Sequence, residues 1–408
     1  MLLEGLKVVE MSTWVAGPST AAVLADWGAD VIKVERPIGD ATRVYYPDTP
    51  ESPGNPIFTN ENRGKRGIVL DLARPGAVEA LKALLREADI FITNVRPGGL
   101  KRQGLDYDSL KAEMPRLIYA AVTGYGLTGP EADTPAFDLT AFWARSGVAH
   151  ATIPSDQAPF GSRPGFGDHT TALATVSAIL AAVHERHQTG RGRLVETSLI
   201  RAAAYAISWD LSALLRFGQV TTARPRSERM VAHSGFFRTR DDRWVYLMPR
   251  TLDDFTNTML VVDRPELLAD PRFEAPVTDP LAIRELCQIV DDGFAQLTLE
   301  EACARLTELD VAHAPLGTLE ELVEAPFAEA AGCFQPVADG WGGSFRVAAA
   351  PARFPEGAPA VGMAAPKLGE HTREVLESAG LTADQIDELI QSGAAIQGAQ
   401  HPASAGAR

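Results

Sequence analysis

The chain has 408 residues, of which 45% are hydrophobic and 22% are charged, and its formal net charge is −15. This length predicts two domains with room for a large core, and the composition excludes a largely disordered chain. The acidic balance argues against a nucleic-acid partner, because affinity for phosphate backbones needs a basic face.

The three cysteines, Cys287, Cys303 and Cys333, lie far apart and form no CxxC pair. They therefore exclude a disulfide framework and a cysteine-based zinc site, and we expect no metal. Sparse cysteine use, an N-terminus without a secretory signal pattern, and the lack of an apolar stretch of about 18 uncharged residues favour a cytoplasmic protein with no membrane partner.

Short β-rich runs alternate with helical patterns in the first part of the chain. The predicted strands are 6–11, 30–35, 67–72, 88–95 and 116–124. Helices are predicted at 17–30 and 76–88, and a loop rich in Pro, Gly and Asp covers 37–62. Strands separated by helices form βαβ units, so we predict a doubly wound α/β domain with a mostly parallel sheet. Such sheets bind ligands at the loops that follow the carboxyl ends of their strands.

The most regular helical pattern covers 167–188, where apolar residues recur at spacings of three and four. A turn and a strand are expected within 189–199, followed by a long helix at 200–217. This stretch extends the α/β pattern by one further strand and two helices.

The character of the sequence changes after Arg226. A strand at 244–248 and helices near 252–260, 281–295 and 299–309 predict a smaller α+β domain. Two short helices are expected within 369–390. The small, polar residues 393–408 show no pattern and are predicted to be a disordered tail.

Residues Gly124 to Gly129 match GxGxxG and follow a predicted strand, as a dinucleotide-binding loop does. The context argues against that function, because Pro130 follows at once and the motif lies far from the first βα unit. We interpret it as a glycine loop that lets the backbone approach a neighbouring group closely.

Basic residues recur after successive strands of the predicted sheet. They are Lys33, Arg36, Arg43, Arg63, Lys65, Arg66, Arg96, Lys101 and Arg102. A single surface Lys or Arg usually has no role beyond solvation. Because a parallel sheet gathers these loops at one edge, however, the set indicates a ligand with several phosphates.

Asp168 stands at the start of the helix predicted from 167, within the sequence PGFGDH. An aspartate there often caps the helix. The same place suits a reactive carboxylate, because a helix N-terminus favours the ionised form and the flanking glycines can bring backbone N–H groups to a reacting carbonyl. His169 is more often structural than catalytic in such a place.

Several blocks of the sequence together resemble the class III CoA-transferase family. They are EGLKVVEMSTWVAGPST, NENRGKRGIVLDL, TNVRPGGLKRQG, TGYGLTGP, GDHTTAL, HQTGRGRLVETSL and PKLGEHT, and the resemblance covers about 3–389. It implies an interlocked, ring-shaped homodimer whose chains each have a Rossmann-like large domain (1–200), a linker helix (201–224), a smaller α+β domain (225–330) and a return to the large domain (331–392).

The resemblance also implies the substrates and site residues. The nucleophile is Asp168, the aspartate of the GD motif. Coenzyme A enters as part of an acyl-CoA substrate, and no cofactor is bound permanently. The implied contacts with coenzyme A are Val15, Ala16, Arg36, Lys65, Arg66, Asn94, Val95 and Arg102. The implied substrate pocket includes Phe137, Asp138 and Gly167.

Two departures from the family patterns narrow the activity. The racemase branch has a histidine where this chain has Phe137, which disfavours an acyl-CoA racemase or isomerase. The oxalate-acting branch has a run of glycines where SERMVAHSGFF has only Gly235. PAFDLTAFWARSG most resembles the branch that handles aromatic or branched 2-hydroxy acids, and Phe137, Phe142 and Trp143 suit an apolar acyl group, although core packing also explains them. A non-catalytic acyl-CoA-binding protein remains the third alternative, which the retained Asp168 opposes.

Overall fold

The computed structural model describes residues 1–46, 54–220, 222–274, 277–354 and 362–398. The chain divides into two units. The first comprises Met1–His150, Phe160–Val220 and Glu329–Arg408, and the second comprises Ala151–Pro159 and Thr221–Ala328. All the residues discussed below as a functional site belong to the first unit.

The first unit is built on a seven-stranded sheet with the order β12-β3-β2-β1-β4-β5-β6. The strands are β1 (Lys7–Met11), β2 (Asp30–Glu35), β3 (Lys65–Leu70), β4 (Ile90–Thr93), β5 (Ile118–Thr123), β6 (Leu194–Ser198) and β12 (Ala395–Ile396). The first six are parallel, and β12 pairs antiparallel with β3. The predicted α/β class with a parallel-rich sheet is therefore confirmed.

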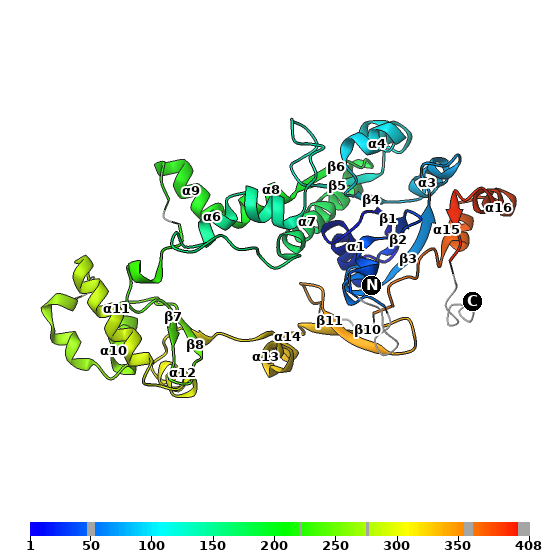
Figure 1. Ribbon diagram of the computed structural model, residues 1–408. Helices are drawn as coiled ribbons and strands as arrows, with labels where there is room; N and C mark the ends of the chain where they lie inside the picture. Colours follow the sequence, from blue (N-terminus) through cyan, green and yellow to red (C-terminus); the bar gives the residue numbers. More distant parts are fainter. Residues whose placement is uncertain (47–53, 221, 275–276, 355–361, 399–408) are drawn as a thin grey trace. The chain divides into compact units, whose positions relative to one another are not determined.

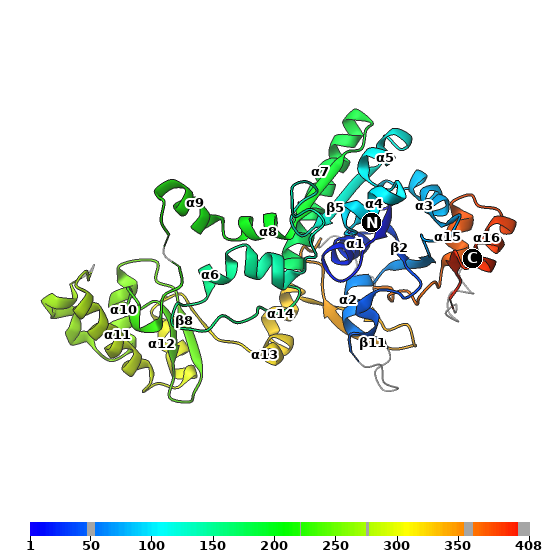
Figure 2. The ribbon, with the colours of Figure 1, turned by 45° about the horizontal axis from the view of Figure 1, so that its top comes forward.

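Helices cover both faces of this sheet (Figures 1 and 2). On one face, α1 (Ala16–Asp26) and α7 (Phe166–Thr189) pack on alternate strand residues such as Val8 and Ile90. On the other, α3 (Ala77–Arg86) belongs to the core cluster that includes Val9 and Phe91. Because successive strand residues point to opposite faces, the apolar runs of these strands supply both layers.

Helix α7 is long and apolar enough to cross a membrane by length and composition alone. Its buried residues, which include Val176 and Ile179, pack in the core against α1, β5 and β6. Core helices of this kind pass the same composition test, so we interpret α7 as part of the core.

Further elements complete the first unit around the sheet. They are η1 (Ala41–Val44), α2 (Pro56–Asn62), α4 (Pro97–Gln103), α5 (Tyr107–Glu113), the π-helical η2 (Asp138–Arg145), α6 (Val148–Thr152, which continues into the second unit), α8 (Leu199–Ala206), α9 (Ser208–Phe217), β10 (Phe334–Ala338), β11 (Ser344–Ala348), α15 (Thr372–Ser378) and α16 (Ala383–Gln391). Strands β10 and β11 form an antiparallel pair of their own.

The second unit contains a three-stranded antiparallel sheet covered by helices. Its elements are η3 (Arg226–Glu228), β7 (Gly235–Arg238), β8 (Trp244–Leu247), α10 (Asp253–Val261), η4 (Pro265–Ala269), η5 (Pro271–Phe273), α11 (Pro280–Phe294), α12 (Leu299–Glu308), β9 (His313–Pro315), α13 (Leu319–Glu324) and the start of α14 (Pro326–Ala331). Phe237 of β7, Phe294 of α11 and Leu306 of α12 are fully buried in its core.

Three local predictions are wrong. The helix expected at 200–217, and the linker helix expected at 201–224, divide into α8 and α9 at Ile207, whose backbone is not helical. Ile and Ser at this point have weak helix propensity, and Asp210 favours a first turn. The loop expected at 37–62 ends in α2, which Asn55 caps. The expected tail is ordered at its start, because β12 gains backbone hydrogen bonds from β3; residues 399–408 lie outside the described part.

Candidate active site

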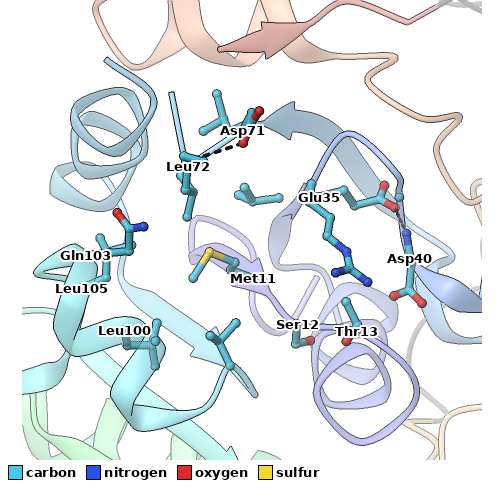
Figure 3. A pocket seen from close by; sticks show the side chains of 17 residues that line it. Met11, Ser12, Thr13, Glu35, Asp40, Asp71, Leu72, Leu100, Gln103 and Leu105 are labelled. Carbon is cyan, nitrogen blue, oxygen red and sulfur yellow. Dashed lines mark hydrogen bonds between the residues drawn. The ribbon is translucent and has the colours of Figure 1, made fainter. Parts of the chain in front are cut away.

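A cavity of about 290 Å³ lies beside the carboxyl ends of β1, β2, β3 and β4, where the strand order reverses between β1 and β4 (Figure 3). Its lining follows these strands and includes Met11, Ser12, Thr13, Arg36, Gly39, Asp40, Leu70, Asp71, Leu72, Ala73, Val95, Gly99, Leu100, Gln103 and Leu105. This switch point is where doubly wound sheets bind ligands, because the loops on its two sides turn in opposite directions.

The interior of the cavity is largely apolar. Figure 3 shows the side chains of Met11, Leu72, Leu100 and Leu105 around it. Arg36, by contrast, is exposed and brings a positive charge to the lining. A ligand that combines an apolar ring system with anionic groups matches this division.

The predicted ligand residues Arg36 and Val95 both line the cavity. Arg102 is exposed on α4, next to the lining residue Gln103. These three residues are available to a ligand, and their contact with one stays a prediction. The apolar lining residues that follow β3, such as Leu72, were not predicted from the sequence, because only basic residues indicate a phosphate ligand. Their position after a strand end was the signal that could have identified them.

The loop that joins β1 to α1 carries the predicted residues Val15, the N-cap of α1, and Ala16, its first residue. The side chain of Asn94 holds this loop. Its Oδ1 accepts from the backbone N–H of Thr13 at 3.0 Å, and its Nδ2 donates to the Thr13 carbonyl at 2.7 Å. Trp14 has a φ of +69°, a conformation that bulky residues rarely adopt. The structure thus gives Asn94 a role in fixing the loop.

Four buried residues form a network under this loop, which we call the lysine cluster: Glu10, Lys33, Asp40 and Lys65. Lys33 Nζ lies 3.2 Å from Glu10 Oε1 and 3.1 Å from Asp40 Oδ2. It also donates to the carbonyl of Ser12 at 3.1 Å. The network therefore supports the loop from below.

The expectation that Lys65 binds phosphate is wrong in this structure. Its Nζ is fully buried and donates to Glu10 Oε2 at 3.0 Å, to the Pro18 carbonyl at 2.9 Å, to the Glu61 carbonyl at 2.8 Å and to Asn62 Oδ1 at 2.9 Å. These acceptors use all its donors. Burial, only partly offset by Glu10, lowers the pKa of Lys65 to about 8.

Arg66 is also engaged elsewhere. Its Nη2 lies 2.7 Å from Asp30 Oδ2, and its Nη1 lies 3.0 Å from Glu374 Oε1. Asp30 begins β2, at the opposite end of the strand from Glu35 and Arg36. The predicted contact of Arg66 with phosphate is therefore wrong, because Arg66 lies at the amino end of its parallel strand and the cavity lies at the carboxyl end.

Asp168 lies in the first turn of α7, as predicted. It does not cap the helix, because the N-cap is Gly165, with a φ of +90°. The adjacent backbone N–H of Gly167 donates to Asp138 Oδ1 at 3.1 Å. A Cβ at Gly167 would lie 2.2 Å from Phe142 Cγ, so only glycine fits there.

Four residues form what we call the carboxylate cluster: Glu61, Asp138, Asp168 and His169. Burial, together with the negative charges of Asp138 and Glu61, raises the pKa of Asp168 to about 7, while His169 acts in the opposite direction. Burial also raises the pKa of Asp138, which is 6% exposed. A carboxyl group with a pKa near neutrality is typical of a reactive site.

Aromatic side chains flank this cluster. The ring of Trp14 contacts that of Phe137 edge to face at 5.5 Å between centroids, and Phe142 contacts Phe166 at 6.1 Å. Trp14, Phe137 and Phe166 are 36%, 52% and 61% exposed. Trp143, also considered from the sequence, is buried and donates to the Phe160 carbonyl, which is a packing role.

The glycine loop after β5 allows the segment with Ala136 and Phe137 to pack closely against it. A Cβ at Gly124 would lie 2.1 Å from the Cβ of Ala136, the residue before Phe137. The close approach predicted from the GxGxxG pattern is thus an approach to another segment of the same chain.

The carboxylate cluster can hold or transfer protons and can present one carboxylate, Asp168, as a nucleophile.

Comparison with known proteins identifies relatives along almost the whole chain. The profile of CoA-transferase family III matches residues 3–372. (R)-2-hydroxy-4-methylpentanoate CoA-transferase of Clostridioides difficile is 35% identical over 96% of this chain and 99% of its own length. Cinnamoyl-CoA:phenyllactate CoA-transferase of Clostridium sporogenes is 31% identical over 95% and 96%. Among solved structures, a CAIB/BAIF family protein from Brucella suis superposes with a TM-score of 0.81 and 29% identity, covering 92% of this chain and 99% of its own.

Proposed function

The chain belongs to CoA-transferase family III and is a class III CoA-transferase, and from this premise we propose that it moves coenzyme A between carboxylic acids through a covalent intermediate on Asp168. The observation that carries the proposal is Asp168 itself, a carboxyl group in the first turn of α7 with a pKa of about 7. At neutral pH a substantial fraction of this group is ionised and able to attack.

In the proposed reaction, Asp168 attacks the carbonyl of the donor thioester and displaces the thiolate of coenzyme A, giving a mixed anhydride. The thiolate then attacks the aspartyl carbonyl, which gives an aspartyl-CoA thioester and releases the donor acid. The carboxylate of the acceptor acid attacks next, and the same steps run in reverse. One thioester replaces another, so the exchange needs no net input of energy.

We assign the nucleotide end of coenzyme A to the cavity beside β1 and β4. The apolar lining suits an adenine ring, and Arg36 and Arg102 suit its phosphates. The loop with Thr13, Trp14 and Val15 connects this cavity to the carboxylate cluster, because Thr13 lines the cavity and Trp14 contacts Phe137. A long ligand can therefore follow the loop to Asp168.

We assign the acyl group to the aromatic surface formed by Trp14, Phe137 and Phe166. These side chains are partly exposed beside the carboxylate cluster and offer apolar contact area. The relatives from Clostridioides difficile and Clostridium sporogenes are named for a branched and an aromatic hydroxy acid. Branched or aromatic 2-hydroxy acids are the substrate class that we propose.

Racemisation is the competing activity, and Phe137 argues against it. Removal of an α-proton from one face and its return on the other take two groups of suitable pKa. Phenylalanine has no ionisable proton to transfer. His169 shares a helical turn with Asp168 and would have to reach the opposite face of the substrate. We therefore favour transfer.

We further propose a homodimer in the cytoplasm. In α9 no residue is buried, and Trp209, Leu215 and Phe217 are 88%, 84% and 72% exposed. Such an apolar helix face is unusual on an isolated chain and suits burial against a second copy. The free thiols of all three cysteines fit a reducing compartment.

A substrate screen tests the proposal. Purified enzyme is incubated with a panel of acyl-CoA thioesters and a pool of free acids, and each new thioester is identified by mass. We expect exchange among branched or aromatic 2-hydroxyacyl groups. Deuterium incorporation at the α-carbon of a 2-methylacyl-CoA in deuterium oxide, with no exchange of coenzyme A between acids, would instead establish a racemase.

A further inference from the structure

Glu61 and His169 form a pair that the proposed mechanism does not use. The Glu61 side chain, on α2, is 4% exposed, and the His169 side chain, in the first turn of α7, is 52% exposed. Nε2 of His169 lies 3.1 Å from Oε1 of Glu61. A carboxylate enclosed in the protein thus has an imidazole from another element as its neighbour.

The carboxylate of Glu61 is fully engaged. Its Oε1 also accepts from Asn60 Nδ2 at 2.7 Å, and its Oε2 accepts from the hydroxyl of Ser19 on α1. Burial opposes ionisation, but the hydrogen bonds from His169, Ser19 and Asn60 outweigh it and lower the pKa of Glu61. Positive charge nearby stabilises a buried anion of this kind. The ammonium of Lys65 donates to the Glu61 backbone carbonyl, and the imidazole of His169 contacts the Glu61 carboxylate itself.

The surroundings of His169 favour the cation. One ring nitrogen faces Glu61, and a charged imidazolium makes a stronger hydrogen bond to this carboxylate than a neutral ring does. The hydrogen bond to Glu61 is the main cause that raises the pKa of His169. A Cβ at Gly165 would lie 3.2 Å from Cε1 of His169, so glycine makes room for the ring.

We propose that Glu61 is a positioning residue that holds His169 as an imidazolium beside Asp168 and thereby keeps Asp168 ionised for attack. The inference rests on the proposed function, in which Asp168 is the nucleophile. The charged groups that face this site are Glu61 on α2, Asp168 on α7, Asp138 in η2 and, behind Glu61, Lys65 on β3, while α1 contributes the hydroxyl of Ser19. Glu61 and Asp138 disfavour a further negative charge on Asp168, and the imidazolium favours it.

Nuclear magnetic resonance tests the charge of His169 without any use of activity. The ring signal of His169 is assigned by its loss in His169→Asn. In the wild type it should titrate above its ordinary value of 6.5, and in Glu61→Gln it should titrate at lower pH. Glu113→Gln, which removes a carboxylate from the exposed end of α5, should leave the titration unchanged. Titration of wild-type His169 at or below 6.5 would overturn the proposal.

The pH dependence of transfer tests the consequence for Asp168. His169→Asn should shift the acid limb of the rate profile upward by about half to one pH unit, because the positive charge beside Asp168 is lost. In Glu61→Gln the weaker imidazolium is opposed by the loss of a negative charge near Asp168, so the shift should be smaller than in His169→Asn. His169→Lys restores a cation and should move the limb back toward the wild-type position. Glu113→Gln should not move it.

The use of both Glu61→Gln and His169→Asn keeps the proposal testable if one variant does not fold. His169 is half exposed, so His169→Asn tests the proposal even where loss of the buried Glu61 charge prevents folding. An unchanged acid limb in His169→Asn would overturn the proposed effect on Asp168. If Asp168 carries no covalent intermediate, the proposed function fails, yet the resonance experiment still decides whether Glu61 holds His169 in the charged form.

Discussion

The two buried ionic clusters of the first unit differ in their balance of charge. In the lysine cluster, Glu10 and Asp40 face Lys33 and Lys65, so two carboxylates meet two ammonium groups. Burial alone would raise the pKa of Glu10, but the two lysines lower it to about 2. In this cluster the positive charges keep the Glu10 carboxylate ionised, and the cluster supports the loop between β1 and α1.

The carboxylate cluster is not balanced in this way. Glu61, Asp138 and Asp168 all interact with the imidazole of His169, and Lys65 adds a positive charge only on the Glu61 side. Burial and the neighbouring carboxylates raise the pKa of Asp168 to about 7. Burial is the main cause that raises the pKa at both Glu10 and Asp168, and the two differ in what opposes it. Two ammonium groups outweigh burial at Glu10, whereas at Asp168 one imidazole opposes burial and two further carboxylates add to it.

The largest expected effect follows from replacing Asp168, the member of the carboxylate cluster that is least stabilised as an anion. In Asp168→Asn the amide cannot attack a thioester, so the transfer rate should fall on the order of 10⁴-fold or more. Binding of coenzyme A, measured by calorimetry, should stay close to wild type. Asp108→Asn, at an exposed site on α5, is the control. Transfer at the wild-type rate in Asp168→Asn would contradict the assignment.

Breaking the balanced cluster should instead cost stability. Lys65→Met leaves Glu10 with one fewer cation in a fully buried site, so the free energy of unfolding should fall by about 3–5 kcal/mol. Denaturation by urea measures it. Lys111→Met, at a half-exposed lysine, should have little effect. Equal stability of the two variants would show that the lysine cluster is not structural.

A smaller effect is expected at the cavity beside the sheet. Arg36→Ala and Arg102→Ala should each weaken the binding of coenzyme A roughly ten- to hundredfold, since a hydrogen bond to a charged group contributes about 1.5–3 kcal/mol. The exposed Arg191→Ala is the control. Unchanged dissociation constants in both variants would move the nucleotide site elsewhere.

A pH-dependent gain of stability is also expected in Asp168→Asn. Folding raises the pKa of Asp168 from 3.8 to about 7, so the native state binds this proton more tightly than the unfolded state does. Wild-type stability due to this group is therefore full below about pH 4 and is lost as the pH rises to 7. The melting temperature of the variant should exceed that of the wild type increasingly over this range. Parallel melting curves at all pH values would contradict the shift.

Much of the fold was predictable because periodicity records burial. The strand predicted at 30–35 is β2, and the helix predicted at 167–188 is α7 within one residue at each end. The doubly wound strand order also predicts where the cavity lies, because ligands bind at the carboxyl ends of the strands where this order reverses. Asp168 was predictable from its glycine-flanked place at a helix start and from the family resemblance.

The rest depended on contacts that sequence patterns do not record. Lys65 and Arg36 both lie beside predicted strands, and only the packed structure shows that Lys65 is buried in the core and that Arg36 is exposed. Glu61 lies 108 residues from His169 and was assigned to a loop. Because helices cover both faces of a parallel sheet, the place of Lys33 in the middle of β2 was the available sign that this lysine is buried.

Covalent trapping at Asp168 tests the central claim most directly. The enzyme is incubated with an acyl-CoA and hydroxylamine, digested, and the peptide that contains Asp168 is analysed by mass spectrometry. We predict a hydroxamate on Asp168 that requires the acyl-CoA, is absent in Asp168→Asn and forms as transfer activity is lost. An unmodified Asp168 in enzyme that is still catalysing transfer, or a hydroxamate at another residue, would contradict the account.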